Sequence, residues 1–532
     1  MSGARYDAIV LGSGLEELVA AASLAGEGRS VLVLEAGPSI GGTAAAEELL
    51  PGFRVDPVHA DAGFLDPRVL RGLELDRHGL ALLAPDPVLA APAERGSALT
   101  FWREPARTRA SIAGRSERDA GRWEAFAERM EAFARILEEV AAGPAPRPAG
   151  PLRELAPFLG LGRRVRKLGR DDMTELFRVL PLPAYDLLED SFEDELLKGA
   201  LGALSVRGLF HGPRAQGTAL VLLHHLVGSP TGCFGIRTVV RGGVGALAEA
   251  LVAAARARGV ELRADSRVEG IDIERGRATA VRLADGAELT ARAILSGLGP
   301  ARTLLDLAGP TWLDPDFVHA LRQIRFRGGF CRIHLALSEA PHFEGLADPP
   351  AGVVVVAARL DDVERAFDDA KHGAASERPV LEARIPSLAD PTLAPAGRHV
   401  MSIDARFVPV DGRAATEPVA PGGVSAETLA HRAVAILAER APNLPGAILE
   451  RRILLPTDIE ARYGLDGGDP FQGELALDQL LFMRPVPGWS GYRTPIPGLY
   501  LCGSGTHPAG AITGVSGRLA ADAVVMDLEE QR

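Results

Sequence analysis

The feature that most constrains this chain is its N-terminal stretch YDAIVLGSGLEELVAA, residues 6–21. Apolar residues 8–11 predict a strand, Gly12-Ser13-Gly14 predicts a tight turn, and the apolar run that follows predicts a helix over 15–25. The run SVLVLEAG at 30–37 predicts a second strand. An apolar helix between two apolar strands is typical of a parallel sheet that is covered by helices.

The same turn predicts a dinucleotide-binding site. Gly12 permits the sharp turn, Gly14 lets the backbone approach a pyrophosphate, and the helix amides and dipole favour that anion. Glu35 lies 21 residues after Gly14, where an acid accepts hydrogen bonds from the adenosine ribose. The pattern departs from G-x-G-x-x-G at its last position, where Glu17 stands beside Glu16. A strand–helix–strand unit without a ligand is the alternative.

A second glycine-rich turn stands near the C-terminus. The stretch YLCGSGTHPAGAITGVSGR, residues 500–518, places five glycines between a predicted strand and the last helix. Such a turn lets backbone amides approach a flat or anionic group, although a generic strand–helix turn has the same composition. No second G-x-G-x-x-G follows a strand, because RGGVGAL at 241–247 has the wrong spacing. One dinucleotide is therefore favoured over two.

Two compositions alternate along the chain and predict two discontinuous domains. Segments 1–75, 237–305 and 455–532 combine apolar strands with glycine turns and are expected to form one α/β domain. Segments 76–236 and 306–454 are expected to form the second. There, residues 116–140 predict an amphipathic helix with Ser116 and Asp119 as a capping pair. Its apolar stripe from Trp123 to Val140 favours core packing over a substrate tunnel.

Composition excludes several classes of function. The net charge of −12 argues against nucleic acid as the main partner. The three cysteines, Cys233, Cys331 and Cys502, are far apart and predict neither a disulfide framework nor a metal site. There is no apolar run of about 20 residues, so no membrane span and a cytoplasmic location are expected. The basic segment GRRVRKLGR, 162–170, is either a solvated helix face or a peripheral contact with an anionic membrane.

Taken together, five stretches resemble the phytoene desaturase-like flavoproteins, and the resemblance runs nearly end to end. They are YDAIVLGSG, VLVLEAGPSIGGTAAAEELLPGF, GGVGALAEAL, ALDQLLFMRPVPG and YRTPIPGLYLCGSGTHPAG. The resemblance implies an α/β fold in which a glutathione-reductase-type, Rossmann-like FAD/NAD(P)-binding domain is joined to a discontinuous α+β substrate domain. It also implies FAD as cofactor and hydride transfer from a hydrophobic, isoprenoid-like substrate. Because no NAD(P) motif is visible, the electrons are expected to pass to oxygen or a quinone.

The resemblance also implies which residues meet the cofactor. Residues 266–296 predict three short strands with turns at ERGR (274–277) and ADG (284–286), a β-meander. Pyrophosphate would lie at the first glycine turn, ribose at the acid that ends the second strand, and adenine at the start of this meander, while the C-terminal turn would face the flavin. The implied set is Gly12, Gly14, Glu35, Ala36, Gly41, Gly42, Val268, Gly503, Gly505 and Gly514. His507, within the C-terminal turn, is either a catalytic residue near the flavin or a histidine bonded to backbone. His224 and His225 are expected to be packed within a helix.

Three places depart from the family pattern. Glu17 stands where glycine is usual, Gln472-Gly473 stands for a His-Gly pair, and Ala509 and Ala511 dilute the last glycine run. Two charges about 6 Å apart repel by roughly 3 kcal/mol at an effective dielectric near 20, on the order of a hundredfold in affinity. Glu17 could instead point away from the ligand or be neutralised. The alternative function is a non-catalytic binding protein like the Rab GDP-dissociation inhibitors, which share this fold without using FAD.

Overall fold

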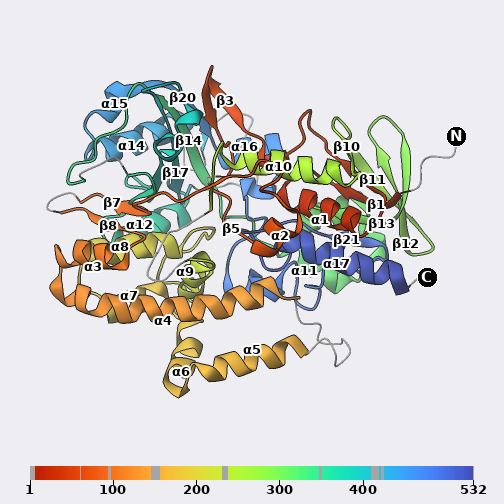
Figure 1. Ribbon diagram of the computed structural model, residues 1–532, viewed down its shortest axis with the longest axis horizontal. Helices are drawn as coiled ribbons and strands as arrows, with labels where there is room; N and C mark the ends of the chain where they lie inside the picture. Colours follow the sequence, from red (N-terminus) through yellow and green to blue (C-terminus); the bar gives the residue numbers. More distant parts are fainter. Residues whose placement is uncertain are drawn as a thin grey trace.

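Two seven-stranded sheets organise the molecule, and helices pack against each of them (Figure 1). The structure is a computed structural model that describes residues 6–59, 61–93, 97–144, 156–229, 238–346, 350–408, 419–420 and 424–530. Cys233 and part of the Pro-rich break at 143–151 lie outside the described residues. The α/β fold with a Rossmann-like domain that the sequence predicts is confirmed.

The first sheet is built around β1 (Tyr6–Leu11). This strand pairs in parallel with β2 (Val31–Leu34) on one side and β13 (Glu288–Ser296) on the other. Strand β10 (Glu261–Arg263) extends the sheet beyond β2, and β21 (Leu499–Leu501) pairs with β13. Helices α1 (Leu15–Gly26), α10 (Val244–Ala257) and α17 (Val515–Glu530) lie side by side over this sheet (Figure 1). The carboxyl ends of β1 and β2 therefore open onto the loops that begin at Gly12 and Glu35.

An antiparallel meander completes this sheet. Strands β11 (Val268–Glu274), β12 (Arg277–Leu283) and β13 pair in sequence order. The turns between them fall at the two places where the sequence predicts them, because Gly276 and Gly286 both adopt positive φ. Val268, the first residue of the meander, lies near the loops that follow β1 and β2.

The second sheet has one apolar face and one charged face. Its order is β20 (Ile448–Leu454), β14 (Phe330–Leu337), β17 (His399–Arg406), β16 (Leu381–Arg384), β15 (Val353–Val356), β7 (Leu89–Ala91) and β8 (Leu99–Phe101). Alternate residues such as Ile333 and Ile403 pack with helices α14 (Ala426–Ala438) and α15 (Leu444–Ala447). Because successive side chains of a strand point to opposite faces, Arg332, Glu382 and Asp404 share the other face.

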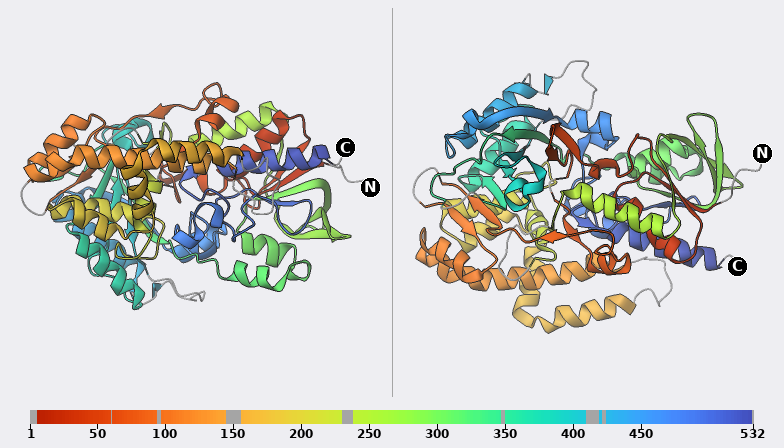
Figure 2. Two further views of the ribbon diagram at one scale, coloured as in Figure 1. Left: turned by 90° about the horizontal axis from the view of Figure 1, so that it is seen from below. Right: turned by 45° about the horizontal axis from the view of Figure 1, so that its top comes forward.

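A helical layer covers the rest of the second domain. It contains α3 (Pro105–Ala113), α4 (Glu117–Ala142), α7 (Ala184–Ser191), α8 (Glu195–Ser205), α9 (Thr218–Leu226) and α12 (Leu360–Lys371). Ser116 Oγ accepts a hydrogen bond from the Asp119 backbone N–H at 3.1 Å, which confirms the predicted cap of α4. Trp123 and Phe133 on this helix are buried in the main core, so the stripe is packing and not a tunnel. Helices α5 (Ala156–Lys167) and α6 (Arg170–Val179) lie at the edge of the molecule (Figure 2).

The strands of the two sheets follow the alternation of composition along the chain. Those of the first sheet come from within 1–75, 237–305 and 455–532, and those of the second from within 76–236 and 306–454. From this membership we propose the same division into two domains. The remaining short elements include β3 (Glu47–Leu50), β4 (Phe53–Val55), β5 (Phe64–Leu65), β6 (Leu82–Leu83), β9 (Val239–Val240), β22 (Ile512–Thr513), α2 (Pro67–Gly72), α11 (Pro315–Arg322), α13 (Pro386–Ala389) and α16 (Pro456–Tyr463).

Two expected absences can be compared with the described residues. Among them, no helix is both long and apolar enough to cross a bilayer. Within the same residues, no group of three or more His, Cys, Asp or Glu side chains is arranged to hold a metal ion. Cys331 and Cys502 are buried free thiols, and burial raises the pKa of both well above the usual value.

Candidate functional site

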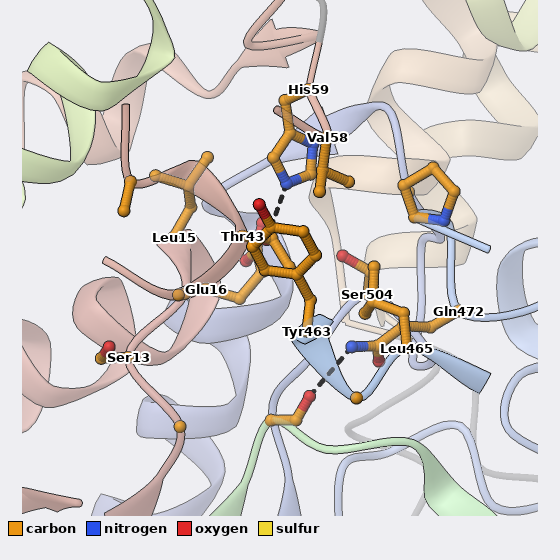
Figure 3. A pocket seen from close by; sticks show the side chains of 18 of the residues that line it. Ser13, Leu15, Glu16, Thr43, Val58, His59, Tyr463, Leu465, Gln472 and Ser504 are labelled. Carbon is orange, nitrogen blue, oxygen red and sulfur yellow. Dashed lines mark hydrogen bonds between the residues drawn. The ribbon is translucent and has the colours of Figure 1, made fainter. Parts of the chain in front are cut away.

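A cavity of about 690 Å³ is lined by residues from both sheets. One end is formed by the loop after β1, the loop after β2 and the start of β11. The other end is formed by the charged face of β14, β16 and β17. Figure 3 shows residues from distant segments meeting around it, among them Ser13, Thr43, Val58, His59, Tyr463, Gln472 and Ser504.

The first end is a cradle of backbone, and glycine is what keeps it open. Gly12 has φ +94°, a conformation that side chains disfavour. A Cβ at Gly42, which has φ +53°, would lie 3.2 Å from the Gly14 backbone nitrogen. The loops after β1 and β2 therefore approach each other closely, and bare backbone faces the cavity between them.

Glu35 holds this cradle in shape. Its Oε2 accepts hydrogen bonds from the Ser13 N–H at 3.0 Å and from Ser13 Oγ at 2.5 Å. Its Oε1 accepts from the Gly37 N–H at 2.8 Å. Ser13 Oγ in turn accepts from the Gly41 N–H at 2.9 Å. The carboxylate expected to meet ribose lines the cavity and also ties together the loops of the cradle.

Glu17 lies against the glycines of the cradle. A Cβ at Gly14 would lie 2.5 Å from Glu17 Oε2, and a Cβ at Gly297 would overlap the Glu17 carboxyl. The side chain is only 7% exposed. Burial, followed by the negative charges of Glu16 and Glu35, raises the pKa of Glu17 to about 8. At neutral pH this carboxyl is therefore mostly protonated, and the electrostatic penalty expected from an ionised Glu17 is largely absent.

Glu16 has a separate structural role. Its carboxylate accepts hydrogen bonds from the Gly514 N–H at 2.6 Å and the Gly517 N–H at 2.8 Å. Burial raises the pKa of Glu16 to about 7, although these two amides act to lower it. Helix α1 thus supplies a hydrogen-bond acceptor at the start of α17, which explains how α1 and α17 are fixed to each other.

The loop before the C-terminal turn is held by one buried arginine. Arg484 is 2% exposed and donates to the carbonyl oxygens of Gln479 at 2.6 Å, Phe471 and Ser504 at 2.7 Å each, Glu474 at 3.1 Å, and also Gly473. Gln472, which departs from the family pattern, donates from Nε2 to the Gly297 oxygen at 3.1 Å and accepts from the Gly505 N–H at 3.0 Å. Gly297 is therefore contacted by two of the departures, Glu17 and Gln472.

Comparison with known proteins assigns this arrangement to a family. Residues 10–68 match the NAD(P)-binding Rossmann-like domain, and residues 85–401, more than half of the chain, match the flavin containing amine oxidoreductases. The chain belongs to the flavin-containing amine oxidoreductase family. Pyridine nucleotide-disulfide oxidoreductase domain-containing protein 2 of Mus musculus is 35% identical over 98% of this chain and 94% of that protein.

Two further similarities agree with this family. Phytoene desaturase (lycopene-forming) of a Paracoccus species is 31% identical over 54% of each chain. A solved structure of a putrescine oxidase variant covers 99% of both chains with a TM-score of 0.61 at 15% identity, which shows the shared fold. The protein is an FAD-dependent oxidoreductase, and the match favours this function over that of a non-catalytic binding protein.

The residues present fit FAD. The cradle of Gly12, Gly14 and Gly42 offers bare backbone to a pyrophosphate, and an added Cβ at Gly42 would fill it. Glu35, Ala36 and Val268 line the same end of the cavity, where ribose and adenine are expected. Glu17, the acid that departs from the glycine pattern, lines the cavity beside this cradle and is mostly neutral at pH 7.

Some expected cofactor residues lie outside the cavity lining. Gly41 packs against Ala45 and Ala248, and the Gly514 amide is bound to Glu16. Gly503 and Gly505 flank Ser504, which does line the cavity, and they pack closely against Gly297 and Pro300. These four glycines therefore pack beside the cavity and do not line it. A pattern of glycines in the sequence does not distinguish such packing from direct contact with a cofactor.

His507 does not line the cavity. Its Nε2 is 3.1 Å from the Gly143 oxygen at the end of α4, and its ring stacks on Phe482. Burial lowers the pKa of His507 to about 4. The structure agrees with a histidine bonded to backbone, and the catalytic role that the sequence left open is not retained. His224 and His225 are packed in α9, each with Nε2 at 3.0 Å from a backbone oxygen.

The diluted glycine run carries backbone strain. Ala509 and Ala511 have φ of +106° and +73°, in the region that favours glycine. The Ala511 oxygen accepts from the Phe64 N–H at 2.9 Å, and Ala511 lines the cavity. The turn therefore holds both alanines in a backbone conformation that glycine adopts more readily.

No pattern in the sequence predicts the pair of Thr43 and His59. Thr43 Oγ1 lies 2.8 Å from His59 Nε2, and both residues face the cavity (Figure 3). Burial, followed by the positive charge of Arg332, lowers the pKa of His59 to about 4, so its ring is neutral at pH 7. The arginines of the second sheet were missed as well. Charged residues at alternate positions in the apolar runs LEAR (381–384) and IDAR (403–406) were the available signal.

Proposed function

We propose that the protein oxidises a carbon–hydrogen bond of a small molecule that has an apolar part, as a dehydrogenase or desaturase. Bound FAD supplies the hydride-accepting chemistry. The residues of the chain bind and orient the substrate and exclude water. The observation that carries the proposal is the continuity of the cavity from the glycine cradle to the face of the second sheet.

An apolar part of the substrate is supported by hydrocarbon and aromatic side chains in the cavity lining. They are Val58, Leu298, Phe330, Tyr463, Leu465 and Phe471. The relative that is named as a phytoene desaturase acts, by that name, on a hydrocarbon. An isoprenoid-like hydrocarbon part is the form that we propose.

Oxygen or a quinone is the electron acceptor that we propose. A nicotinamide dinucleotide would need a second large site, and the sequence has no second glycine fingerprint. A second cavity beside Arg54 and Asp56 measures about 30 Å³, which holds little more than one water.

The acceptor can be tested without knowing the substrate. The flavin of the purified protein is reduced photochemically without air and then mixed with air-saturated buffer, a soluble quinone, NAD⁺ or NADP⁺. The recovery of the oxidised flavin absorbance is followed by stopped flow. We expect oxygen or the quinone to reoxidise the flavin at least tenfold faster than either nucleotide. Faster reoxidation by NAD⁺ or NADP⁺ would contradict this proposal.

Two more expectations remain proposals. The basic segment 162–170 is mainly exposed, in keeping with either a solvated face or contact with anionic lipid. Co-sedimentation with phosphatidylserine vesicles tests that contact, and equal recovery with neutral vesicles would exclude it. A cytoplasmic location is tested by fractionation of the native cells, where recovery outside the cytosolic fraction would contradict it.

A further inference from the structure

The far end of the cavity is built from buried charges. Four arginines, Arg207, Arg332, Arg384 and Arg406, and three carboxylates, Asp61, Glu382 and Asp404, line it. We call these seven residues the arginine cluster. Six of them are less than 10% exposed at the side chain, and Arg384 is 13% exposed. Charges are rarely buried at this density unless each has a partner.

One arginine of the cluster has an acceptor within the protein at each of its three side-chain nitrogens. Arg332 donates from Nε and Nη2 to the two Asp404 oxygens at 2.7 and 2.8 Å. Its Nη1 donates to the Val58 carbonyl oxygen. This bidentate pair and the third acceptor occupy every nitrogen of Arg332, so we assign Arg332 and Asp404 a structural role in the cluster.

Two arginines share one carboxylate. Arg406 donates to Glu382 Oε1 from Nε at 3.1 Å and from Nη2 at 2.6 Å. Arg207 donates to the same carboxylate from Nε at 3.3 Å and also from Nη2. Although burial acts to raise it, the guanidinium groups of Arg207, Arg406 and Arg384 hold the pKa of Glu382 well below its usual range. Glu382 therefore stays ionised and compensates one of its two bonded arginines.

Several guanidinium N–H donors of the other three arginines have no acceptor among the described residues. Arg384 donates from Nη2 to Asp61 Oδ2 at 2.9 Å. In the described part of the chain, no oxygen accepts from Nε or Nη1 of Arg384, or from Nη1 of Arg207 or Arg406. Arg207 and Arg406 are 6% and 7% exposed at the side chain, and both line the cavity.

The charges of the cluster do not cancel. Within the seven residues of the cluster, four guanidinium groups face three carboxylates, which is an excess of one positive charge. Burial lowers the pKa of Arg384. The negative charge of Asp61 opposes this effect, and the positive charge of Arg207 adds to it. An uncompensated buried charge is costly, and a ligand of opposite charge removes that cost. A protonated amine, in contrast, would add to the excess.

We propose that Arg207, Arg384 and Arg406 bind a carboxylate group of the substrate through their unused N–H donors. The planar fork of an arginine suits the two oxygens of a carboxylate, and one negative charge balances the excess. Together with the apolar side chains that line the cavity, this assigns the substrate class as a carboxylic acid with a hydrocarbon chain. This inference rests on the proposed function, because it names the substrate of the same cavity.

A matched set of phenyl compounds tests the charge requirement. Phenylacetate, phenylacetamide, benzylphosphonate and 2-phenylethylamine are titrated into the flavin-containing protein, and the shift of the flavin visible band is recorded. Thermal shift of the same samples gives a second readout. We expect phenylacetate to bind at least tenfold tighter than each of the other three. Equal binding of the amide, or tighter binding of the phosphonate or the amine, would overturn the carboxylate assignment.

Two variants locate the binding. Arg406→Lys keeps a charge near Glu382 but loses the Nη1 donors, and Arg384→Gln removes a partly exposed donor. Both should bind phenylacetate at least tenfold more weakly than the wild-type protein while retaining its flavin content. Arg493→Lys is the matched control, because Arg493 makes a bidentate pair with Asp527 outside the cavity. Unchanged phenylacetate affinity in Arg406→Lys and Arg384→Gln would contradict the assignment.

The two hypotheses can fail separately. If the flavin is reoxidised by oxygen or quinone but phenylacetate and its amide bind alike, the inference fails and the proposed function stands. If reduced flavin reacts faster with NAD⁺ or NADP⁺ while phenylacetate still binds selectively, the acceptor proposal fails and the carboxylate site stands. The thermal shift gives the selectivity independently of any flavin signal.

Discussion

At the scale of single residues, Glu17 sets the pH range in which the cradle suits an anion. Below a pH of about 8 its carboxyl is protonated and adds no charge beside a pyrophosphate. Above that pH it ionises, or FAD must bind together with a proton. FAD affinity of the wild-type protein should therefore fall by up to about a hundredfold as pH rises from 7 to 10. Equilibrium dialysis measures it.

Two variants isolate this effect. Glu17→Gln removes the ionisation at nearly equal volume, and Glu17→Gly restores the usual glycine. Both should show a flatter pH profile than the wild-type protein, with little gain in affinity at pH 7 and a clear gain at pH 10. A large gain for Glu17→Gly already at pH 6 would show that Glu17 is ionised or obstructive at neutral pH, against this account.

Glu17 also predicts a pH dependence of folding. Its pKa is about 8 in the folded chain and about 4.5 in the unfolded chain, so the folded state binds more protons between these values. Its contribution to stability is complete below pH 4.5 and is lost as pH rises through 8. A shift from about 4.5 to about 8 corresponds to about 5 kcal/mol of stability lost in flavin-free protein. Urea unfolding of wild type and Glu17→Gln from pH 5 to 9 should converge at low pH and diverge at high pH, and parallel curves would refute it.

The contact between Glu17 and Gly297 makes a third residue-scale prediction. A Cβ at Gly297 would overlap the Glu17 carboxyl. Gly297→Ala should therefore destabilise the protein by about 2 kcal/mol or more, because the Glu17 side chain must move. In the Glu17→Gly background the same change should cost less than about 0.5 kcal/mol, as measured by a double-mutant cycle. Equal costs in both backgrounds would mean that the two side chains do not compete for this space.

At the scale of elements, one side chain organises the loop from Phe471 to Gln479. Arg484 donates to five carbonyl oxygens there and at Ser504 and has no carboxylate partner among them. Burial lowers the pKa of Arg484 to about 10, which still leaves it charged at neutral pH. Arg484→Lys should destabilise the protein by about 3 kcal/mol and lower its flavin content, because an ammonium has too few donors. Arg493→Lys, away from the cavity, is the control and should retain its flavin.

Elements that depend on local pattern were predictable, and contacts between distant elements were not. The strand at 8–11, the helix at 15–25, the Ser116 cap and the meander each follow from neighbouring residues. The fate of Glu17 depends on Gly297, which is remote in sequence and adjacent only because β1 pairs with β13. The arginine cluster could not be predicted either, because Glu382 and Asp404 are brought together only by the pairing of β16 with β17.

At the scale of the whole molecule, the fold divides the work of the site. The first sheet and its helices present backbone to the cofactor, and the second sheet presents charged side chains to the opposite end of the same cavity. Gly12, Gly14 and Glu35 could be predicted from their spacing in the sequence, and Gly42 from the resemblance to the family. The substrate end could not, because its residues come from five separate segments, three strands of the second sheet and two loops, and only the fold brings them together.

The flavin content of the purified protein tests the central claim most directly. The claim is that the cavity between the two sheets holds one FAD against the glycine cradle. After incubation with excess FAD and gel filtration at pH 7, the protein is denatured and the released cofactor is quantified against protein. The account predicts one FAD per chain. Protein that remains colourless and releases no flavin would contradict it.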